Sequence, residues 1–410
     1  MTGPGTQSDE ADRAALAAAF DPNHLDQTFY ADPYPTYAAL RESDPVHRCP
    51  DGTFFLTRYA DLDEIYRDRV RFSSDKRQVF GPKFGTDSPL YEHHTTSLVF
   101  NDPPYHTRVR RRIVGALTPQ VLHAMEPQIV SLVDSLLNRL GELRQFDIIE
   151  DFAAAIPVEV IGNLLKVPRE DRHPLRGWSV AVLGALEPAV SAEQRASGDR
   201  AVTEFTDYLR LLIDDRRRHP LDNDLLTRLI QDEDLSLPEL LHNCVFLLNA
   251  GHETTTNLIG NAIHLLLTHP DTMARLRATP ELISSAVEEC LRFESPNQLG
   301  NRLVVQRVVM RGVTFEPGTY LTLCIGAANR DGDEFTRPEV FDIERKPNRH
   351  LAFGAGGHAC AGMTVARLEA QIAIPRFMQR FLHLQLTGEP LRGGRARFRG
   401  FRSLPAQASA

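Results

Sequence analysis

Cysteine is scarce in this chain of 410 residues, and its five cysteines are scattered along the sequence: Cys49, Cys244, Cys290, Cys324 and Cys360. No two of them form a C-x-x-C pair, so we predict neither a zinc site nor a disulfide framework. Isolated thiols of this kind fit a reducing compartment, and we therefore expect a cytoplasmic protein.

Long apolar runs and an excess of positive charge are also missing. No run reaches the roughly 18 apolar residues that a membrane helix needs, so no membrane partner is expected. The opening MTGPGTQSDEADRAAL is polar and acidic, which excludes a signal peptide and predicts a disordered lead over residues 1–20. The formal charge of −8 argues against general binding of nucleic acid. We expect a monomer.

The most informative stretch of the chain is FGAGGHACAG, from Phe353 to Gly362. Its glycines allow a close backbone approach, and the residues from Met363 onward have the apolar spacing of a helix. Cys360 would then lie near a helix N-terminus, where the dipole favours a thiolate. A thiolate held in this way suits a soft metal, although a free cysteine in a turn is an open alternative.

A second unusual stretch lies inside a long, nearly apolar helix. The helix is expected to begin at the capping box Ser236–Glu239 and to end before Pro270. Its centre reads Ala250-Gly-His-Glu-Thr-Thr-Thr256, and glycine, threonine and a buried glutamate all disfavour a helix interior. A helix that breaks local rules at its centre is a candidate functional site, the alternative being a polar bridge to a neighbouring helix.

Further segments supply candidate residues. A basic helix over 105–117 places His106 and Arg110 four residues apart on one face, which could also be a solvated stripe. Residues 76–96 are expected to form a loop that carries aromatics. Glu289 and Arg292 lie three apart on another helix, and residues 302–323 are predicted to form hairpins.

Together these pieces resemble the bacterial cytochrome P-450 family, the haem-thiolate monooxygenases. The family patterns F-x-x-G-x-x-x-C-x-G, A-G-x-[DE]-T and E-x-x-R are met at 353–362, 250–254 and 289–292. The resemblance implies a mainly α fold, with a large helical portion around a long central helix and a small β-rich portion, as one domain over 21–410. Where many members have P-E-R-F, this chain has PEVF at 338–341, so Arg345 is the nearest substitute for the third residue of a Glu-Arg-Arg network.

The resemblance also implies a haem b cofactor and assigns residues to it. Cys360 would be the axial ligand of the iron, because a thiolate pushes electron density onto the metal and favours O–O cleavage. Phe353, Gly356 and Gly362 belong to the same cofactor-binding pattern. Four cations would face the propionates, namely His106, Arg110, Arg302 and His358. Any one of these four could instead face solvent.

The likeness makes Glu253 and Thr254 the acid and alcohol that deliver protons to bound dioxygen. Glu289 and Arg292 would be structural. His252 is expected to be a packed or solvent-facing histidine, and Thr255 and Thr256 to serve helix packing.

Family likeness also places substrate contacts at nine positions. These are His93, His94, Thr95, Leu98, Phe100, Leu247, Ala250, Asn297 and Leu299. The mixture of polar and apolar side chains suits a small or medium-sized organic molecule with one polar anchor, which could be hydroxylated, epoxidised or O-dealkylated.

No flavin or iron–sulfur module is evident in the sequence, so electrons are expected to come from a separate ferredoxin and its reductase, with NAD(P)H acting only indirectly. Arginines 108, 111 and 112 could contact such an acidic carrier, although ordinary surface charge explains them as well. A haem sensor, a peroxygenase that needs no reductase and a cysteine hydrolase are the alternatives. A sensor would need neither Glu253 nor Thr254, and members that use peroxide typically lose the threonine that this chain keeps. For a hydrolase, Cys360 has no evident base partner except His358.

Overall fold

The computed structural model describes residues 4–117, 119–222, 224–232 and 234–408. The chain divides into two compact units. The first unit comprises Met1–Ser74, Ser285–Cys360 and Arg392–Arg399, and the second comprises Asp75–Ser284, Ala361–Leu391 and Gly400–Ala410. Each unit is described by itself.

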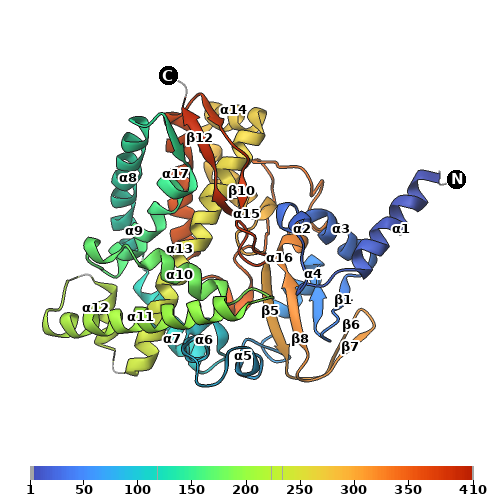
Figure 1. The fold of residues 1–410 in the computed structure, drawn as a ribbon, viewed down its shortest axis with the longest axis horizontal. Helices are drawn as coiled ribbons and strands as arrows, with labels where there is room; N and C mark the ends of the chain where they lie inside the picture. The colour runs from blue at the N-terminus through green and yellow to red at the C-terminus, as the bar shows by residue number, and fades with distance from the viewer. Residues whose placement is uncertain (1–3, 118, 223, 233, 409–410) are drawn as a thin grey trace. The chain divides into compact units, whose positions relative to one another are not determined.

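The first unit contains a five-stranded sheet in the order β1-β2-β8-β5-β3. Strands β1, β5 and β8 of this sheet are labelled in Figure 1. Strands β2 and β8 are parallel, and the other neighbours are antiparallel. The sheet packs its apolar face against α4 and a core that includes Leu56, Phe315 and Leu323. The strands of this unit are β1 (Val46–Arg48), β2 (Phe54–Leu56), β3 (Phe72–Ser73), β5 (Leu299–Val304), β8 (Tyr320–Cys324) and the hairpin β6 (Val308–Met310) and β7 (Val313–Phe315).

The helices of the first unit lie in its N-terminal part and before the cysteine loop. Residues 4–18 differ from the predicted disordered lead, because they form the helix α1, which contacts α3 and buries Ala17. The remaining helices are α2 (Gln27–Ala31), α3 (Tyr34–Ser43), α4 (Tyr59–Arg67), α15 (Ile283–Phe293), which begins at the edge of the second unit, α16 (Ile325–Ala328) and the short 3₁₀ turn η5 (Gly356–His358).

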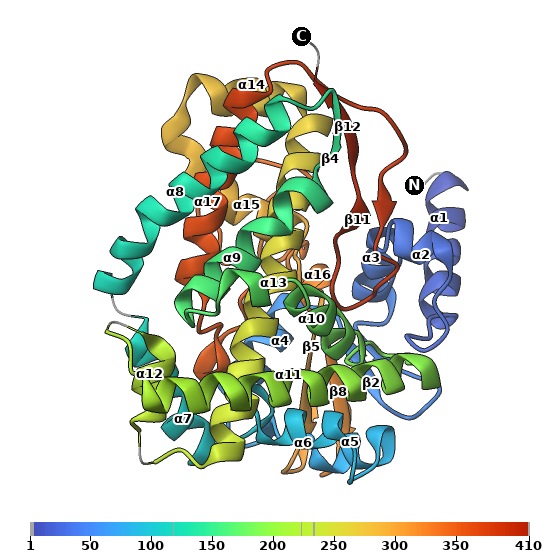
Figure 2. The same cartoon turned by 60° about the vertical axis from the view of Figure 1, so that its left-hand side comes forward.

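The second unit is built around α13 (Leu237–Thr268). Ser236 caps this helix by accepting a hydrogen bond from the amide of Glu239, and the Glu239 carboxylate accepts one from the Ser236 amide, as the capping box predicts. Helices α9 (Ala155–Leu164), α10 (Leu175–Gly184) and α17 (Met363–Arg380) pack against α13 (Figures 1 and 2). This packing explains why so many α13 residues are apolar and buried.

The other elements of the second unit surround this centre. A small antiparallel sheet has the order β4-β12-β9. The elements are α7 (Tyr105–Ala116), α8 (Pro119–Gly141), α11 (Ala192–Arg218), α12 (Leu225–Ile230), α14 (Pro270–Ala278), η1 (Leu98–Phe100), η2 (Ile149–Ala153), η3 (Arg169–Asp171), η4 (Pro280–Leu282), β4 (Gln145–Asp147), β9 (Leu384–Leu386), β10 (Leu391–Arg392, at the division of the units), β11 (Phe401–Ser403) and β12 (Pro405–Ala408).

Residues 76–96 are mostly helical, which corrects the predicted loop. They form α5 (Arg77–Phe84) and α6 (Pro89–Thr96). Ser88 caps α6 by accepting a hydrogen bond from the amide of Tyr91, and its hydroxyl donates to Asp199 of α11. The cap and Pro89 at the first helical position fix where α6 begins.

In the part of the chain that the structure describes, no helix is long and apolar enough to span a membrane.

Candidate functional site

The loop before α17 brings Cys360 into a closed turn. The Cys360 amide donates a hydrogen bond to the carbonyl of Phe353 at 2.8 Å, and the Ala359 amide donates to Gly356 at 3.2 Å. Cys360 is half-buried, whereas the other four cysteines are buried. Helix α17 begins at Met363, so the cysteine lies directly before a helix N-terminus, as the apolar spacing predicts. Among the five thiols, only this one is open to a ligand from outside the chain.

The shape of this loop depends on Gly356. Its backbone has φ of +65°, and a Cβ atom there would lie 2.4 Å from the carbonyl oxygen of Tyr66. Both the dihedral angle and the close approach exclude any other residue type without a shift of the backbone. The loop is thereby held against the C-terminal end of α4.

Arg302 lies in the same unit as the cysteine loop. It is on β5 and only 9% exposed. Its guanidinium carbon is 5.0 Å from the centre of the Tyr66 ring, and Nη1 donates to the Asn301 carbonyl at 2.8 Å. His358 is half-buried in η5. The first unit therefore presents two cationic or potentially cationic side chains together with the cysteine.

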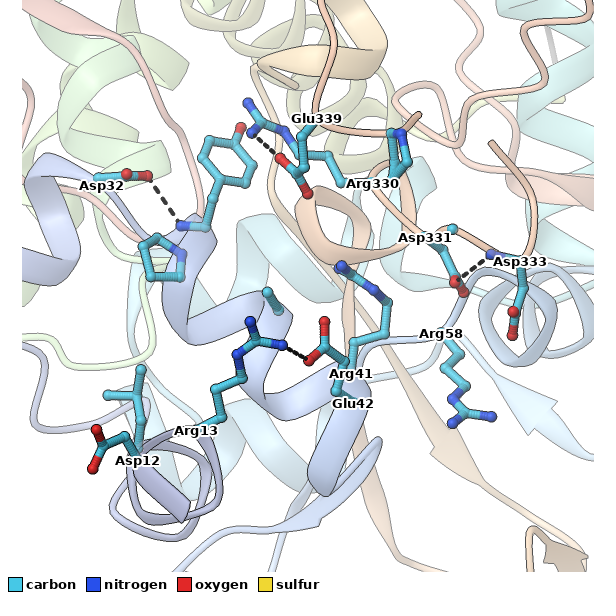
Figure 3. A pocket seen from close by; sticks show the side chains of 16 residues that line it. Asp12, Arg13, Asp32, Arg41, Glu42, Arg58, Arg330, Asp331, Asp333 and Glu339 are labelled. Carbon is cyan, nitrogen blue, oxygen red and sulfur yellow. Dashed lines mark hydrogen bonds and ion pairs between the residues drawn. The ribbon is translucent and has the colours of Figure 1, made fainter. Parts of the chain in front are cut away.

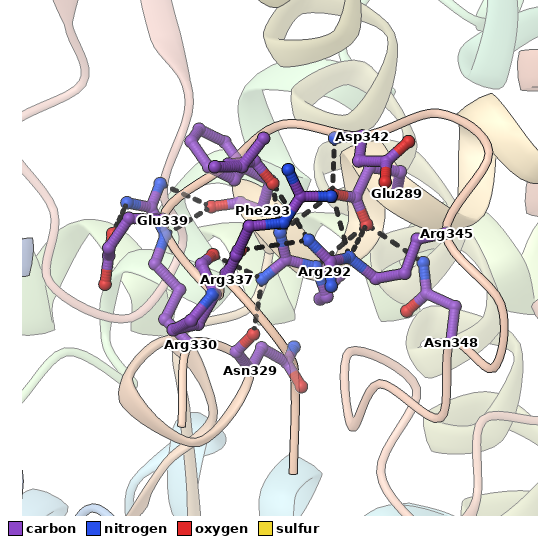
Figure 4. A network of polar contacts seen from close by, with 12 residues as sticks. Glu289, Arg292, Phe293, Asn329, Arg330, Arg337, Glu339, Asp342, Arg345 and Asn348 are labelled. Atoms are coloured by element: carbon purple, nitrogen blue, oxygen red, sulfur yellow. Dashed lines mark hydrogen bonds and ion pairs between the residues drawn. The ribbon is translucent and has the colours of Figure 1, made fainter. Parts of the chain in front are cut away.

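Figure 4 shows the polar network around Glu289, a completely buried carboxylate. Arg292 forms two hydrogen bonds with Glu289, each of 2.8 Å, and also donates to backbone carbonyls of the 329–340 segment. The Nε atom of Arg345 lies 3.1 Å from Glu289, and Asn348 donates to it at 3.1 Å. Arg345 thus occupies the third position of the Glu-Arg-Arg network that PEVF at 338–341 had left in doubt.

Two residues of α7 carry the expected cationic pair in the second unit. His106 is 2% exposed, and Arg110, one turn later, is half-buried. Arg110 has no hydrogen bond or ion pair to any residue that the structure describes. A half-buried guanidinium without a counter-charge is suited to a carboxylate brought by a ligand.

Of the three arginines expected to meet a carrier protein, Arg111 is exposed and its role stays a prediction, whereas Arg108 and Arg112 are bound by carboxylates of this chain. Arg108 pairs with Glu239 at 2.5 Å, and Arg112 pairs with Asp232 at 2.9 Å and with Asp234. These two side chains fasten α7 to the segment before α13, so their charges are already compensated.

The unusual centre of α13 is continuous helix. The Thr254 hydroxyl donates to the Ala250 carbonyl at 2.9 Å, and Glu253 is half-buried beside it. Gly251 does not break the helix; a Cβ atom there would lie 3.4 Å from the side chain of Ile161 in α9. That distance is an ordinary van der Waals contact, so packing against α9 does not by itself require glycine, and Glu253 and Thr254 are presented by a regular helix.

His252 is buried, which agrees with a packed histidine rather than a ligand. Burial, together with the charge of Arg176, lowers the pKa of His252 to about 3, so the imidazole is neutral. Arg176 of α10 pairs with Glu150. This pairing raises the pKa of Arg176, and the negative charges of Asp147 and Glu253 raise it further. Arg176 is thus within electrostatic reach of Glu253, a relationship between helices that no sequence spacing indicates.

The nine candidate substrate positions fall in both units. His93, His94 and Thr95 are on α6, Leu98 and Phe100 are on η1, and Leu247 and Ala250 are on α13; Asn297 and Leu299 belong to the first unit. Several of them take part in packing. Leu98 packs with Val109 and Ile113, and Asn297 bridges to Phe398. Their role toward a substrate stays a prediction.

A cavity of about 930 Å³ lies in the first unit, lined by α1, α3 and the segment 330–339 (Figure 3). Four of its charged lining residues form ion pairs, Arg13 with Glu42 and Arg330 with Glu339. None of the predicted site residues lines it.

Among the described residues, no group of three or more histidine, cysteine, aspartate or glutamate side chains could hold a metal ion. A metal bound through Cys360 alone would have to bring further ligands of its own. A porphyrin does so, and in the first unit the buried Arg302, whose guanidinium lies over the Tyr66 ring, is a cation suited to one of its propionates. The residues present therefore fit a haem.

Comparison with known proteins agrees with this reading. The sequence pattern of the family described as "Cytochrome P450" matches residues 188–392. The chain is 37% identical to the biotin biosynthesis cytochrome P450 of Bacillus subtilis over 383 residues, which are 90% of this chain and 95% of that protein. It is 41% identical to the vitamin D(3) 25-hydroxylase of Pseudonocardia autotrophica over 358 residues, 85% of this chain and 86% of the other.

Solved structures give the same result for the fold. P450BioI, in a complex with an acyl carrier protein ligated to hexadec-9Z-enoic acid, superimposes with a TM-score of 0.89 at 35% identity, covering 93% of this chain and all of that one. CalO2 has a TM-score of 0.89 at 33% identity, covering 96% and 99% of the two chains. The mainly helical fold predicted from the sequence is confirmed, and the chain belongs to the cytochrome P450 family of monooxygenase enzymes.

Proposed function

We propose that this P450 binds haem b through Cys360 and inserts one oxygen atom of O2 into a small or medium-sized organic substrate by hydroxylation, epoxidation or O-dealkylation. Electrons come from a separate ferredoxin and its reductase, and NAD(P)H acts through them. The observation that carries the proposal is the closed loop at Cys360, which leaves one thiol of five accessible at a helix N-terminus.

Each residue proposed to hold the haem is assigned by the family pattern at its position. Cys360 ligates the iron, and Arg110, His106, Arg302 and His358 face the propionates. When bound, the haem supplies the activation of dioxygen. The lack of an internal counter-charge at Arg110 supports this role, because a propionate would compensate the guanidinium.

Glu253 and Thr254 are proposed to move protons into the dioxygen site. The Thr254 hydroxyl donates its hydrogen to the Ala250 carbonyl, which leaves its oxygen lone pairs free to accept a hydrogen bond. Glu253, half-buried on the neighbouring position, can pass protons inward through water.

The substrate is proposed to be an elongated lipophilic molecule with one polar group. Leu98, Phe100, Leu247 and Ala250 offer apolar contacts, and the imidazoles of α6 offer hydrogen bonds. The relatives support this class by their names, since they include a vitamin D(3) hydroxylase and a P450 solved with a fatty acid on a carrier protein.

The deciding experiment is a difference spectrum of the reduced protein with and without carbon monoxide. We expect the absorption band of a thiolate-ligated haem, and we expect Cys360→Ala to abolish it. A band that persists in the Cys360→Ala variant would overturn the proposal. Lipophilic alcohols and acids can then be screened for spin-state shifts to identify the substrate class.

A further inference from the structure

The cavity of the first unit is separate from the proposed haem and substrate residues, because none of them lines it. Its volume is about 930 Å³, and it lies between α1, α3, the start of α4 and the segment 330–339 (Figure 3). Cavities of this size hold small organic molecules in many proteins. Its lining combines apolar side chains and the ring of Tyr34 with four arginines, namely Arg13, Arg41, Arg58 and Arg330.

Two of the four arginines are compensated within the chain. Arg13 pairs with Glu42 at 2.5 Å. Arg330 pairs with Glu339 at 2.8 Å and also donates to the Phe293 carbonyl at 2.8 Å. These two cations therefore have no need of a charge from outside the chain.

Arg41 of α3 is buried without a counter-charge. Its side chain belongs to a residue that is 9% exposed, and Nη1 donates to the carbonyl of Ala327 at 3.1 Å. No carboxylate in the described part of the chain forms an ion pair with it. A guanidinium has five N–H donors, and burying its charge is costly unless an anion compensates it. Arg41 is thus suited to an anion that enters the cavity.

Arg58 supplies a second uncompensated charge on the same cavity. It is half-buried directly before α4, and its side chain has no hydrogen bond or ion pair to any residue that the structure describes. Two carboxylates near it in this part of the fold are engaged elsewhere. Asp331 accepts a hydrogen bond from the Tyr59 amide at 2.9 Å, and Asp61 pairs with Arg311 at 2.6 Å.

The acidic residues of the lining limit the charge that a ligand can carry. Carboxylates outnumber arginines around the cavity. Asp32 and Asp331 accept hydrogen bonds from backbone amides, whereas Asp12 and Asp333 are exposed where the cavity meets solvent. A second negative charge on a ligand would be repelled by these groups. The lining therefore favours a singly charged anion.

We infer that this cavity is a binding site for a small organic monocarboxylate, held by Arg41 and attracted further by Arg58. The carboxylate accepts charge-assisted hydrogen bonds from the N–H groups of Arg41. The apolar part of the ligand packs against Leu16, Pro35 and Tyr34, which line the cavity.

A ligand at this site also stabilises the segment 330–339. Pro338 lines the cavity, and its carbonyl accepts a hydrogen bond from Arg292 at 2.8 Å. Binding to the folded chain alone raises its stability by mass action. The site therefore links the concentration of a carboxylate to the stability of the segment that the Glu289 network holds.

The experiment uses the haem-loaded protein with 4-fluorobenzoate as the probe, observed by ¹⁹F NMR. We expect saturable binding with a dissociation constant of about 1 mM. Arg41→Gln should weaken it at least about tenfold and Arg58→Gln about threefold, because each removes a cation from the lining. Asp333→Asn should strengthen it about twofold by removing a repelling charge. Benzoate should displace the probe, and benzene-1,3-dicarboxylate should do so less well.

A second variant separates binding from the packing of α3. Ala38 is half-buried and lines the cavity, so Ala38→Leu fills part of it and keeps both arginines. It should weaken binding at least about threefold, because the ring of the probe loses contact area. The controls are Ala18→Leu, at an exposed position outside the lining, and Arg307→Gln, on an exposed pair with Glu316. Both should stay within about twofold of wild type.

Equal affinities in wild type, Arg41→Gln and Ala38→Leu would overturn the inference. So would stronger displacement by the dicarboxylate than by benzoate, or the absence of saturable binding to wild type up to about 20 mM probe. The proposed function fails separately, by the lack of a thiolate-ligated carbon monoxide band in the wild-type protein.

Discussion

The Nε atom of Arg345 lies 3.1 Å from Oε2 of Glu289, and the Glu289 side chain is completely buried. Arg345 also donates to the carbonyls of Thr336 at 2.7 Å and Val340 at 3.0 Å. It therefore joins α15 to the irregular segment that precedes the cysteine loop. The valine at position 340 is tolerated because the guanidinium that completes the network comes from five residues further along.

We expect Arg345→Met to destabilise the protein by about 3 kcal/mol, because it removes one partner of a buried carboxylate while leaving the charge in place. Urea unfolding of the haem-loaded protein, followed by circular dichroism, measures this loss. Arg307→Met, which removes an arginine that is 69% exposed, should cost less than about 0.5 kcal/mol. A loss below about 1 kcal/mol in Arg345→Met would show that Arg292, Asn348 and the Asp342 amide satisfy Glu289 without Arg345.

Substitution by alanine at two glycines of the cysteine loop should have different effects on the stability of the protein. Gly356→Ala places a Cβ atom 2.4 Å from the Tyr66 carbonyl at a φ of +65°, so we expect a folding defect or a clear fall in melting temperature. A Cβ atom at Gly362 meets no atom within 4 Å, and φ there is −93°. Gly362→Ala should therefore keep the stability of the haem-free chain.

Haem titration of these two variants separates folding from cofactor contact. If the open side of Gly362 faces the haem, Gly362→Ala weakens haem binding without lowering the melting temperature of the haem-free protein. Equal melting temperatures for the two haem-free variants would contradict the assignment of Gly356 as the residue that fixes the loop.

Local signals in the sequence were sufficient to predict where several helices begin. Ser236 and Glu239 marked the start of α13 correctly, and the apolar spacing after Gly362 marked α17. The prediction of a loop over residues 76–96 was wrong, because it gave more weight to the glycines and prolines than to a helix N-cap in the same segment. The cap is Ser88, followed by Pro89. A helix cap of two residues is easily overlooked among turn-forming residues.

Contacts that join distant segments could not be predicted from spacing. Arg176 approaches Glu253 only because α10 packs on α13, and Arg69 reaches Gly357 only because α4 lies along the cysteine loop. The same limit applies to Arg108 and Arg112. The run of basic residues suggested that both side chains were available to a partner protein, whereas both bind carboxylates near α13. Charge patterns give the sign of a surface, whereas pairing depends on the tertiary structure.

Thr254→Ala should uncouple electron use from product formation. Removing the hydroxyl takes away the group proposed to accept a hydrogen bond beside dioxygen, so we expect product per NADPH to fall at least about tenfold, with hydrogen peroxide formed instead. Oxygen and NADPH consumption and product are measured together with a substrate found by the spin-state screen.

Thr256→Ala is the control, because Thr256 makes the same type of bond, from its hydroxyl to the His252 carbonyl at 3.1 Å. Both variants lose a bond to a helix carbonyl, which has a small effect on stability. Only Thr254→Ala should lose coupling, and equal coupling in the two variants would rule out the acid–alcohol assignment.

A cluster of buried histidines should make stability depend on pH. The ring centres of His93 and His94 are 5.0 Å apart, and those of His93 and His242 are 5.7 Å apart. Burial, followed by the charges of His94 and His242, lowers the pKa of His93 well below its usual 6.5. Burial also lowers the pKa of His242, although the nearby Glu92 opposes this shift.

Because the folded-state pKa of His93 is below that of the unfolded chain, the unfolded state binds more protons below about pH 6.5. The free energy of unfolding should therefore be highest above pH 6.5 and fall progressively below it, by up to about 1.4 kcal/mol per pH unit for each proton taken up. Urea unfolding between pH 5 and pH 7.5 measures the slope. His93→Leu should make the slope shallower, whereas His219→Gln, which changes a side chain that is 72% exposed, should leave it as in wild type. An identical slope in wild type and His93→Leu would mean that α6 and α13 accommodate the charged imidazole of His93 without loss of their packing.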